Sequence, residues 1–345
     1  MKKRTKIALA VAAILLAVGA TLCNIARGRG ESLLSLLQSG GLSVSSGQAQ
    51  IGDRQKGYTV CLTGEESFST DDVRSLTLEW ISGSVEVEPW DGDTVVVREE
   101  AAQPLTEDQR LRWKLVDGGL RVLCCANGET KLPDKRLTVL VPRADSLVFV
   151  DTDAVSASIR YSDLHVSTDL DAASTSGEIL VRGCEGLWLD IDTTSGAVTV
   201  EETSVKEEID LDTTSGDIAV HSCSCSVFDA DTVSGAVRAE ALAVGKELNV
   251  DTGSGAVELR ALAARGSVDV DTISGRVLVQ MSAQPREVDV DTTSGAVALS
   301  FPKGTTVDLS FDTASGRLSG MLSSAPGGIP VDVDTVSGDL TIGES

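Results

Sequence analysis

A short motif, Asp-Thr-x-Ser-Gly, recurs through the C-terminal two-thirds of this 345-residue chain at nearly constant spacing. Consecutive copies lie 19 to 22 residues apart, and a degenerate copy at residues 153–157 lies 20 residues before the first one. Repeats of this length predict units that stack on their neighbours, because one unit alone cannot bury an apolar face. The glycines that end the nine copies are Gly177, Gly196, Gly216, Gly235, Gly255, Gly275, Gly295, Gly316 and Gly338.

The residues that precede each motif alternate as in a β-strand. In the copy at residues 288–299, Val288 and Val290 share one strand face, and Asp289 and Asp291 share the other. The valines must be buried, so the aspartates are expected to face outward.

The motif itself predicts a corner. Val297 and Leu299 are apolar at an odd offset from Val290, so the side of the chain that faces inward changes between them. Residues 293–295 therefore form a corner or a bulge. We expect the glycine there to adopt a positive φ, while the Asp, Thr and Ser side chains hydrogen-bond the local backbone.

These units predict an all-β fold, a parallel β-solenoid with about 20 residues per coil. Coils stacked about 4.8 Å apart form parallel sheets around a continuous core of Val and Leu. The composition agrees, since 41% of the residues are hydrophobic but only 3% are aromatic, and small β-branched side chains suit a thin stacked core. An antiparallel β-sandwich or meander, in which each unit is a hairpin, is the alternative.

Stacking in register places like residues above one another and predicts two columns of acidic residues. Neighbouring carboxylates about 5 Å apart repel by roughly 1 kcal/mol in water and about 3 kcal/mol at a partly buried site. The Asp192 column comprises Asp192, Asp212, Asp231, Asp251, Asp271, Asp291, Asp312 and Asp334, and the Asp190 column comprises Asp190, Asp210, Asp229, Asn249, Asp269, Asp289, Ser310 and Asp332.

Two interactions can offset this repulsion. Hydroxyl and turn N–H groups can donate hydrogen bonds to the carboxylates, or Ca²⁺ can bind between them, which makes the aspartates of both columns candidate calcium ligands. The chain lacks the Gly-Gly-x-Gly-x-Asp nonapeptide of calcium-binding β-rolls and the calcium loop of helix-loop-helix proteins, so a calcium site here is of another type.

The N-terminus carries a membrane anchor or an export signal. Four basic residues lie within residues 1–6, and the seventeen residues 7–23 carry no charge. This length is near the lower limit for crossing a bilayer and favours a retained single-pass anchor within residues 1–30, with its N-terminus in the cytoplasm. Cleavage after Val18-Gly19-Ala20, which gives a secreted protein, and lipidation at Cys23 are the alternatives.

Three further regions follow the N-terminal segment. Residues 31–57 contain a short amphipathic stretch and a Ser- and Gly-rich run, which is typical of a juxtamembrane spacer. Residues 58–150 alternate as β-strands and hold three of the four tryptophans, which predicts a β-rich N-terminal part of the solenoid or a cap at one end of it. Residues 151–345 are the repeat region.

The seven cysteines show no disulfide spacing. The segment His221-Ser-Cys223-Ser-Cys225 contains soft-metal ligands, but a structural zinc site needs four ligands and no second pair accompanies these. We therefore interpret this segment as an irregular loop between two repeats.

The formal net charge is −23, from 52 acidic and 29 basic residues. Such a surface repels phosphates, which excludes nucleic acid as a partner of the folded part, and it attracts cations. A solvated surface explains the same charge.

No catalytic constellation stands out, and we expect a protein that is not an enzyme. Asp251-Thr-Gly253 resembles an aspartic-protease motif, but that site needs two such carboxylates, and here the tripeptide is one variant of the repeat. The two histidines, His165 and His221, lie in no nucleophile-elbow or phosphate-loop motif. A glycan-active β-helix enzyme with paired carboxylates is the remote alternative.

The motifs resemble those of the bacterial "putative adhesin" β-repeat family, whose members lie on the cell envelope and have no known function. The likeness covers about residues 70–345 and includes a lead-in at residues 82–89, Leu140-Val-Pro142, and the repeats from residues 192–196 to residues 334–338. The resemblance implies a surface location, some relatives are encoded beside envelope-stress genes, and no catalytic residues are carried over.

We therefore expect a surface-displayed structural or adhesion-type protein. The N-terminal segment holds it in the cell membrane, and the β-region lies outside the cytoplasm, where its acidic stripe is presented to a surface protein, a glycan or a cationic ligand. An envelope-stress sensor or accessory regulator is the alternative function.

Overall fold

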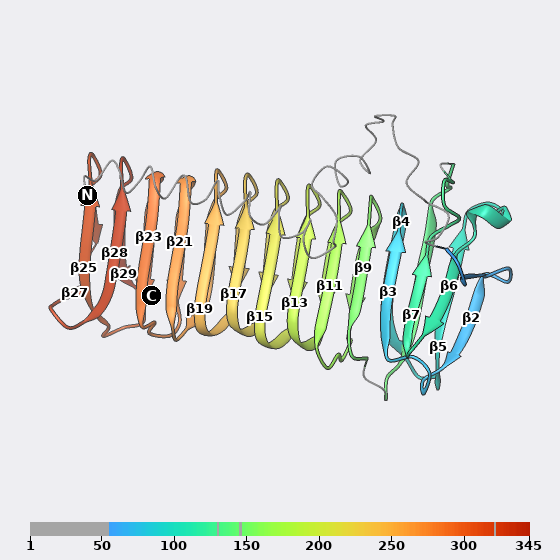
Figure 1. The fold of residues 1–345 in the computed structure, drawn as a ribbon. Coiled ribbons are helices and arrows are strands. Elements are labelled where there is room, and N and C mark those ends of the chain that lie inside the picture. The colour runs from blue at the N-terminus through green and yellow to red at the C-terminus, as the bar shows by residue number, and fades with distance from the viewer. Residues whose placement is uncertain (1–54, 130, 145–146, 321) are drawn as a thin grey trace. The chain divides into compact units, whose positions relative to one another are not determined.

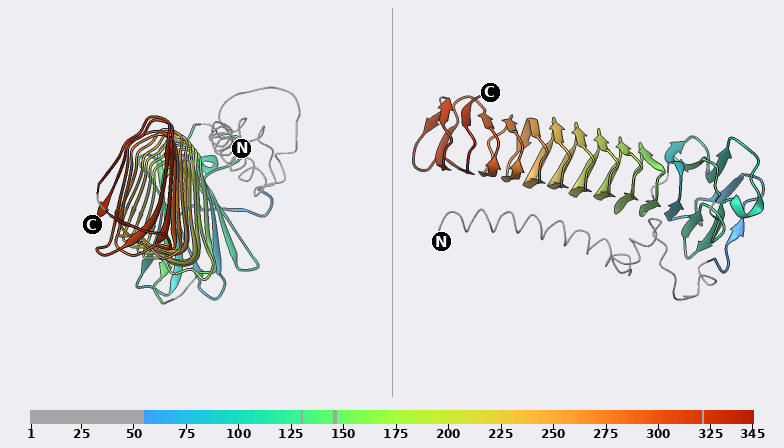
Figure 2. Two further views of the ribbon diagram at one scale, coloured as in Figure 1. Left: turned by 90° about the vertical axis from the view of Figure 1, so that its left-hand side faces the viewer. Right: turned by 90° about the horizontal axis from the view of Figure 1, so that it is seen from above.

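The repeats form a parallel β-solenoid. The structure, a computed structural model, describes residues 55–129, 131–144, 147–320 and 322–345, and Gly57–Ser345 form one compact unit. Within this unit the coils follow one another in a single row (Figure 1), and their outlines superpose when the row is viewed from its end (Figure 2). The predicted anchor at residues 1–30 and most of the predicted spacer lie outside the described residues.

Each coil contributes one strand to sheet A and one to sheet B. In sheet A the strands are β9 (Val150–Ala154), β11 (Asp169–Ser174), β13 (Glu185–Thr193), β15 (Ser204–Thr213), β17 (Ser224–Thr232), β19 (Ala243–Thr252), β21 (Ser267–Ser274), β23 (Glu287–Ser294), β25 (Thr306–Thr313) and β28 (Ile329–Thr335). In sheet B they are β10 (Ser158–Ser162), β12 (Ile179–Arg182), β14 (Val198–Glu201), β16 (Ile218–His221), β18 (Val237–Glu240), β20 (Val257–Ala264), β22 (Val277–Met281), β24 (Val297–Phe301), β26 (Leu318–Gly320) and β29 (Leu340–Glu344).

The pairing between coils is parallel and in register. Asp190 lies opposite Asp210, and Thr193 lies opposite Thr213. In sheet B of the same coils, Val198 lies opposite Ile218. A hairpin-based sandwich would pair neighbouring units antiparallel, so this alternative is excluded and the predicted solenoid is confirmed.

Inward-facing apolar side chains fill the coil interior. Val288 and Val290 of β23 are 2% and 0% exposed, and Val297 and Leu299 of β24 are both 2% exposed. The inward side therefore changes across the motif, as the sequence pattern predicts. Stacked Val, Leu and Ile side chains of successive coils form one continuous core.

Antiparallel strands close the N-terminal end of the row. This region contains β1 (Thr59–Val60), β2 (Glu65–Ser69), β3 (Ser75–Trp80), β4 (Gly83–Trp90), β5 (Thr94–Ala101), the short 3₁₀-helix η2 (Glu107–Gln109), β6 (Arg112–Val116), β7 (Gly119–Leu123) and β8 (Lys135–Pro142). β5 pairs antiparallel with β8, and β6 pairs antiparallel with β7. We call residues 57–144 the cap.

The row does not follow chain order at either end. β3 lies between β7 and β9 in sheet A. The layer of β7 and β8 therefore lies outside the layer of β3 and β4, although it follows that layer in the sequence. At the other end, β28 lies between β23 and β25, and the two-residue strand β27 (Ser323–Ser324) pairs with the outer β25. The last two coils are therefore exchanged relative to the sequence.

Within the described part of the chain, no helix has the length and apolar character needed to cross a membrane.

Candidate functional site

In six coils a hydrogen bond to the threonine hydroxyl of the motif stabilises the corner, whereas Oγ1 of Thr272 and of Thr292 has no partner among the described residues. Thr213 faces the coil interior, and its Oγ1 accepts a hydrogen bond from the N–H of Gly216 at 2.9 Å. This bond confirms the predicted turn chemistry for the threonine of the motif. Equivalent bonds of 2.8–3.0 Å join Thr193 to Gly196, Thr232 to Gly235, Thr252 to Gly255, Thr313 to Gly316 and Thr335 to Gly338.

The glycine of the motif is required by close approach of the backbone. A Cβ atom on Gly216 would lie 1.8 Å from the carbonyl oxygen of Gly196, and one on Gly235 would lie 1.7 Å from that of Gly216. None of the nine motif glycines has a positive φ. The predicted positive φ is therefore wrong, because each corner crosses directly over the corner before it and leaves no space for a side chain.

A second corner follows sheet B, and the sequence pattern does not reveal it. Six successive coils place a residue with a positive φ of 49° to 65° at this corner. Glycine occurs there only once, so no residue type marks the position in the sequence. These residues are Asp163, Gly183, Glu202, Ser222, Ala241 and Ala261.

Both predicted acidic columns lie on the outer face of sheet A. The Asp190 column runs through consecutive register partners, among them Asp190, Asp210 and Asp229. The Asp192 column runs parallel to it, with Asp212 opposite Asp231 and Asp231 opposite Asp251. Because the intervening residues point into the core, the outer face of sheet A carries two adjacent rows of carboxylates.

The structure corrects the columns at their two ends. Asp171 lies opposite Asp190, and Asp151 lies opposite Asp171, so the Asp190 column extends by two coils, although the repeat of Asp171 has Ala173 in place of the second aspartate. At the other end Asp334 pairs with Asp291 and with Asp312, so its place is between them and not after Asp312. Asp332 is likewise placed between Asp289 and Ser310.

Burial raises the pKa of the carboxyl groups in the middle of both columns. Partial desolvation by the neighbouring coils is the largest cause, and repulsion from the aspartates above and below adds to it. The pKa is raised to about 9 for Asp212, to about 8 for Asp210 and Asp271, and to about 7 for Asp251. It is raised to about 7 for Asp171 and to about 6 for Asp229, Asp231 and Asp289.

The largest causes of the raised pKa values of Asp210, Asp212, Asp229 and Asp271 are burial and neighbouring carboxylates, and no cation is among them. The groups that shift these pKa values are other carboxylates and, for Asp229, a backbone N–H. A nearby Lys or Arg would lower the pKa of a carboxyl group instead. The face is therefore a row of closely spaced acids, several of which hold a proton near neutral pH.

No group of three or more His, Cys, Asp or Glu side chains in the described parts of the chain has an arrangement that fits a metal ion. The candidate calcium ligands lie one above another along the columns, with one carboxylate per coil in each column. Calcium binding by these aspartates stays a prediction.

The outer face of sheet B has the opposite character. Its carboxylates have cationic neighbours on the same or adjacent coils, as in the pair of Arg182 with Glu201 at 3.9 Å and the pair of Arg238 with Asp217 at 3.0 Å. Hydrogen bonds from the Ala236 N–H and from Arg238 lower the pKa of the Asp217 carboxyl. The pKa of a carboxyl group is thus raised on the outer face of sheet A and lowered at Asp217 on sheet B.

The cysteine and histidine cluster is not an irregular loop, and its members diverge. His221 ends β16 and is exposed, with Nδ1 3.8 Å from Glu240. Cys223 and Cys225 point into the core and are 2% and 9% exposed. Their regular alternation around the second corner explains this separation. None of the six described cysteines forms a disulfide.

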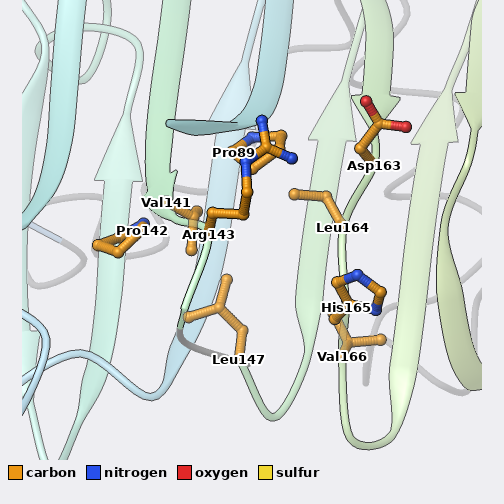
Figure 3. A pocket seen from close by; sticks show the side chains of 9 residues that line it. All are labelled: Pro89, Val141, Pro142, Arg143, Leu147, Asp163, Leu164, His165 and Val166. Carbon is orange, nitrogen blue, oxygen red and sulfur yellow. The ribbon is translucent and has the colours of Figure 1, made fainter. Parts of the chain in front are cut away.

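A small cavity lies where β4 and β8 of the cap meet residues 163–166 (Figure 3). Its volume is about 10 Å³, room for at most about one water molecule. The charged side chains around it have partners elsewhere, since Arg143 lies 3.5 Å from Asp91 and His165 lies 3.2 Å from Glu185. The acidic face of sheet A is therefore the stronger candidate site.

Comparison with known proteins identifies the family to which the chain belongs. Residues 126–288 and 248–343 match the family described as "Toastrack DUF4097", and these two matches together span more than half of the chain. The chain belongs to the Toastrack DUF4097 family. No curated protein matches it.

Two solved structures also resemble this member of the family. One is a "putative cell adhesion protein" from Clostridium sporogenes, with 8% identity, a TM-score of 0.21, and coverage of 81% of this chain and 99% of that chain. The other is a "putative adhesin" from Parabacteroides distasonis, with 13% identity, a TM-score of 0.46, and coverage of 81% and 96%.

Proposed function

We propose that this Toastrack protein is a surface-displayed, adhesion-type β-solenoid that binds a cationic ligand on the outer face of sheet A. Its N-terminal segment anchors it in the membrane, the solenoid lies outside the cytoplasm, and no catalytic role is assigned. The observation that carries the proposal is the pair of carboxylate columns, in whose middle the pKa values are raised by burial and by neighbouring carboxylates.

Regular spacing makes this face suited to an extended partner. Adjacent carboxylates repeat at about 4.8 Å along each column, so a ligand with several positive charges contacts several coils at once. Each contact is weak alone, but linked contacts add because the later ones are intramolecular. The chemistry that fits is a polyamine, a lysine-rich segment of a surface protein, or a cationic group on a glycan.

Binding to a lysine decapeptide tests the proposal. We expect the full chain, purified in a mild non-ionic detergent, to bind the peptide with an affinity that falls steeply as salt rises. A variant with Asp210, Asp212, Asp229 and Asp231 changed to Asn should lose most of the affinity. The matched control removes four carboxylates from sheet B, with Glu201, Glu240 and Glu258 changed to Gln and Asp217 changed to Asn, and it should bind as the parent does.

Equal losses in the two variants would attribute binding to net charge alone, and no binding by the parent would refute the proposal.

The same face also suits an envelope-stress sensor that meets cationic antimicrobial peptides. The phenotype of a deletion strain distinguishes a sensor from an adhesin. Deletion of the gene should abolish the cell's response to cationic peptides if the chain is a sensor, and should abolish attachment of a ligand or surface if it is an adhesin.

A further inference from the structure

One exposed aromatic residue interrupts the acidic outer face of sheet A. Trp188 lies in β13 two residues before Asp190, so both residues face the same side of the strand. Trp188 is 41% exposed, whereas every other aromatic residue in the described part of the chain is buried or half-buried. Single exposed apolar residues are common on protein surfaces, so the surroundings of Trp188 decide whether it has a role.

Acidic residues occupy the positions around Trp188. Two of them lie opposite it on the neighbouring strands β11 and β15, and three lie at the next outward position of β11, β13 and β15, which are adjacent in the row (Figure 1). Neighbouring strands are about 4.8 Å apart, and successive outward positions of one strand are about 6.6 Å apart. The five residues are Asp169, Glu208, Asp171, Asp190 and Asp210.

Trp188 belongs to a third outward column of sheet A, in which an aromatic ring occurs once. Four of the seven positions in this column are acidic. The column comprises Asp169, Trp188, Glu208, Val227, Glu247, Ser267 and Glu287. The ring is therefore confined to one coil, so the acidic face offers one such position and not a periodic row of them.

We propose that Trp188 anchors a subsite for an organic ammonium group, such as that of a lysine side chain, on the acidic face of sheet A. This inference rests on the proposed function and names the residue that makes the binding selective. The face of an indole ring attracts a cation through the quadrupole of its π-system. The surrounding carboxylates attract the same charge, so the ring and the acids bind one ligand group together.

The indole ring favours organic ammonium groups over metal ions at this position. Ca²⁺ takes about six to eight oxygen ligands, and an indole supplies none. An alkylammonium group has apolar methylene groups that pack against the ring, while its N–H groups donate to carboxylates. The ligand class is therefore a cation with an aliphatic stem, which a lysine-rich segment or a polyamine provides.

Paired strands hold the backbone of Trp188 in place. β13 pairs with β11 on one side and with β15 on the other. The N–H groups of Leu187 and Trp188 both donate to the carbonyl oxygen of Thr168, at 2.8 Å and 3.2 Å. A binding residue on such a rigid element keeps its position without reorganisation of the backbone, so the ring is presented to a ligand as the structure shows it.

Substitutions of Trp188 test the inference, with the affinity of the full chain for a lysine decapeptide as the readout. We expect Trp188→Ala to weaken binding by about twofold to fivefold, the effect of one cation–π contact at an exposed site. Trp188→Phe should keep part of the affinity, and Trp188→Leu, which is apolar but has no ring, should bind as Trp188→Ala does. Val227→Ala, a change at a half-buried position of the same column, is the matched control and should bind as the parent does.

Two further readouts separate a direct contact from an effect on folding. The bound peptide should protect the Trp188 emission, which is the part that Trp188→Phe removes, from quenching by acrylamide, and Ca²⁺ alone should give no protection. The ratio of the parent affinity to the Trp188→Ala affinity should stay nearly constant as salt rises, because the indole carries no net charge to be screened. If a variant does not fold, protection of the parent emission decides, since the other three tryptophans lie in the cap.

The outcomes distinguish this inference from the proposed function. Equal binding by the parent and by Trp188→Ala, with no protection from acrylamide, would overturn the inference and leave ligand binding by the carboxylate columns intact. Protection by Ca²⁺ alone would contradict the selectivity for organic cations. A parent chain that binds no peptide would refute the proposed function and the inference with it.

Discussion

Sheet A and sheet B of this solenoid are built from the same coils, but like charges are stacked on the outer face of sheet A and opposite charges are paired on the outer face of sheet B. On sheet A, Asp212 lies between other aspartates, and burial with like-charge repulsion raises its pKa to about 9. On sheet B, Asp217 accepts hydrogen bonds from Arg238 and from a backbone N–H, and its pKa is lowered. Regular stacking therefore does not itself force repulsion, because sheet B mixes its charges from coil to coil.

The acidic character of the sheet A face is thus determined by which residues occupy the outward positions, and not by the solenoid fold itself. Any outward position in a solenoid is stacked on its equivalent in the next coil. If the same charged residue occupies such a position in every coil, like charges accumulate along the column. If the residue at that position differs from coil to coil, opposite charges on neighbouring coils can form ion pairs. The repeated Asp on sheet A weakens the fold at neutral pH, which is reasonable where the charge serves binding.

The largest effect is expected at the corner that joins the two faces. Gly216→Val places a Cβ 1.8 Å from the carbonyl oxygen of Gly196, so the coils must separate, at a cost of about 3 kcal/mol or more. Gly343→Ala is the control, because its Cβ would meet no atom within 4 Å, and it should change stability by less than about 0.5 kcal/mol. Urea unfolding measures both. Equal effects would contradict the close approach of the corners.

The second effect is a dependence of stability on pH that originates in sheet A. The carboxyls of Asp212, Asp210 and Asp271 have pKa values of about 9, 8 and 8 in the fold, against about 3.9 in an unfolded chain. Between about pH 4 and pH 9 the folded state binds more protons, so its stability is highest near pH 4–5 and falls as the pH rises. The thermal midpoint, followed by circular dichroism, should drop by several degrees from about pH 5 to about pH 9. A midpoint that rises over this range would show that the columns are stabilised as anions.

A single substitution in the Asp192 column should remove part of this dependence. Asp212→Asn keeps the shape of the side chain but cannot ionise. At about pH 8 the Asp212 carboxyl, with a pKa of about 9 in the fold, has to stay protonated on folding although it ionises in the unfolded chain, so we expect the substitution to stabilise the fold by about 1–3 kcal/mol. The effect should be smaller near pH 5, which is close to the pKa of about 3.9 in the unfolded chain. A destabilising effect near pH 8 would mean that the carboxylate has a stabilising partner.

The corner threonines provide a smaller and internally controlled effect. Thr213→Val removes the acceptor of the Gly216 N–H and should cost about 1–3 kcal/mol, because a buried donor is left unsatisfied. Thr272 occupies the same position in a later coil, and its Oγ1 has no partner among the described residues. Thr272→Val should therefore be neutral or stabilising. Chemical denaturation of the two variants, compared with each other, measures the difference.

The smallest effect is expected on sheet B. Glu240→Gln removes a carboxylate whose neighbour His221 lies 3.8 Å away on an exposed surface. Exposed pairs contribute about 0–1 kcal/mol, so the substitution should leave both the stability and its pH dependence almost unchanged. A change as large as that of Asp212→Asn would remove the distinction between the faces.

The repeat predicts most of this fold because its period of about 20 residues and its alternating apolar pattern both indicate stacked coils of β-strands. Alternation around Val288 and Val290 identifies the inward side, and the nearly constant spacing of the motifs is enough to align Asp190 with Asp210. The order of the last two coils could not be predicted, because coils of similar length and pattern stack equally well in either order.

The role of the motif glycine was predicted incorrectly for a physical reason. A recurring Gly in a turn is compatible with either a positive φ or a close approach of backbone, and only the distance between Gly196 and Gly216 separates the two. Asp171 was missed because Ala173 breaks its motif.

The sheet A carboxylates are central to the proposed function, because they hold protons near neutral pH and release them when a cation binds. Calorimetric titration of the full chain with a lysine decapeptide near pH 7, in two buffers of different ionisation enthalpy, measures this directly. Because a bound cation lowers the pKa of a carboxyl group, the account predicts a net release of protons that is lost when Asp210, Asp212, Asp229 and Asp231 are changed to Asn. Binding without proton release would show that these carboxylates are already ionised, which contradicts the account.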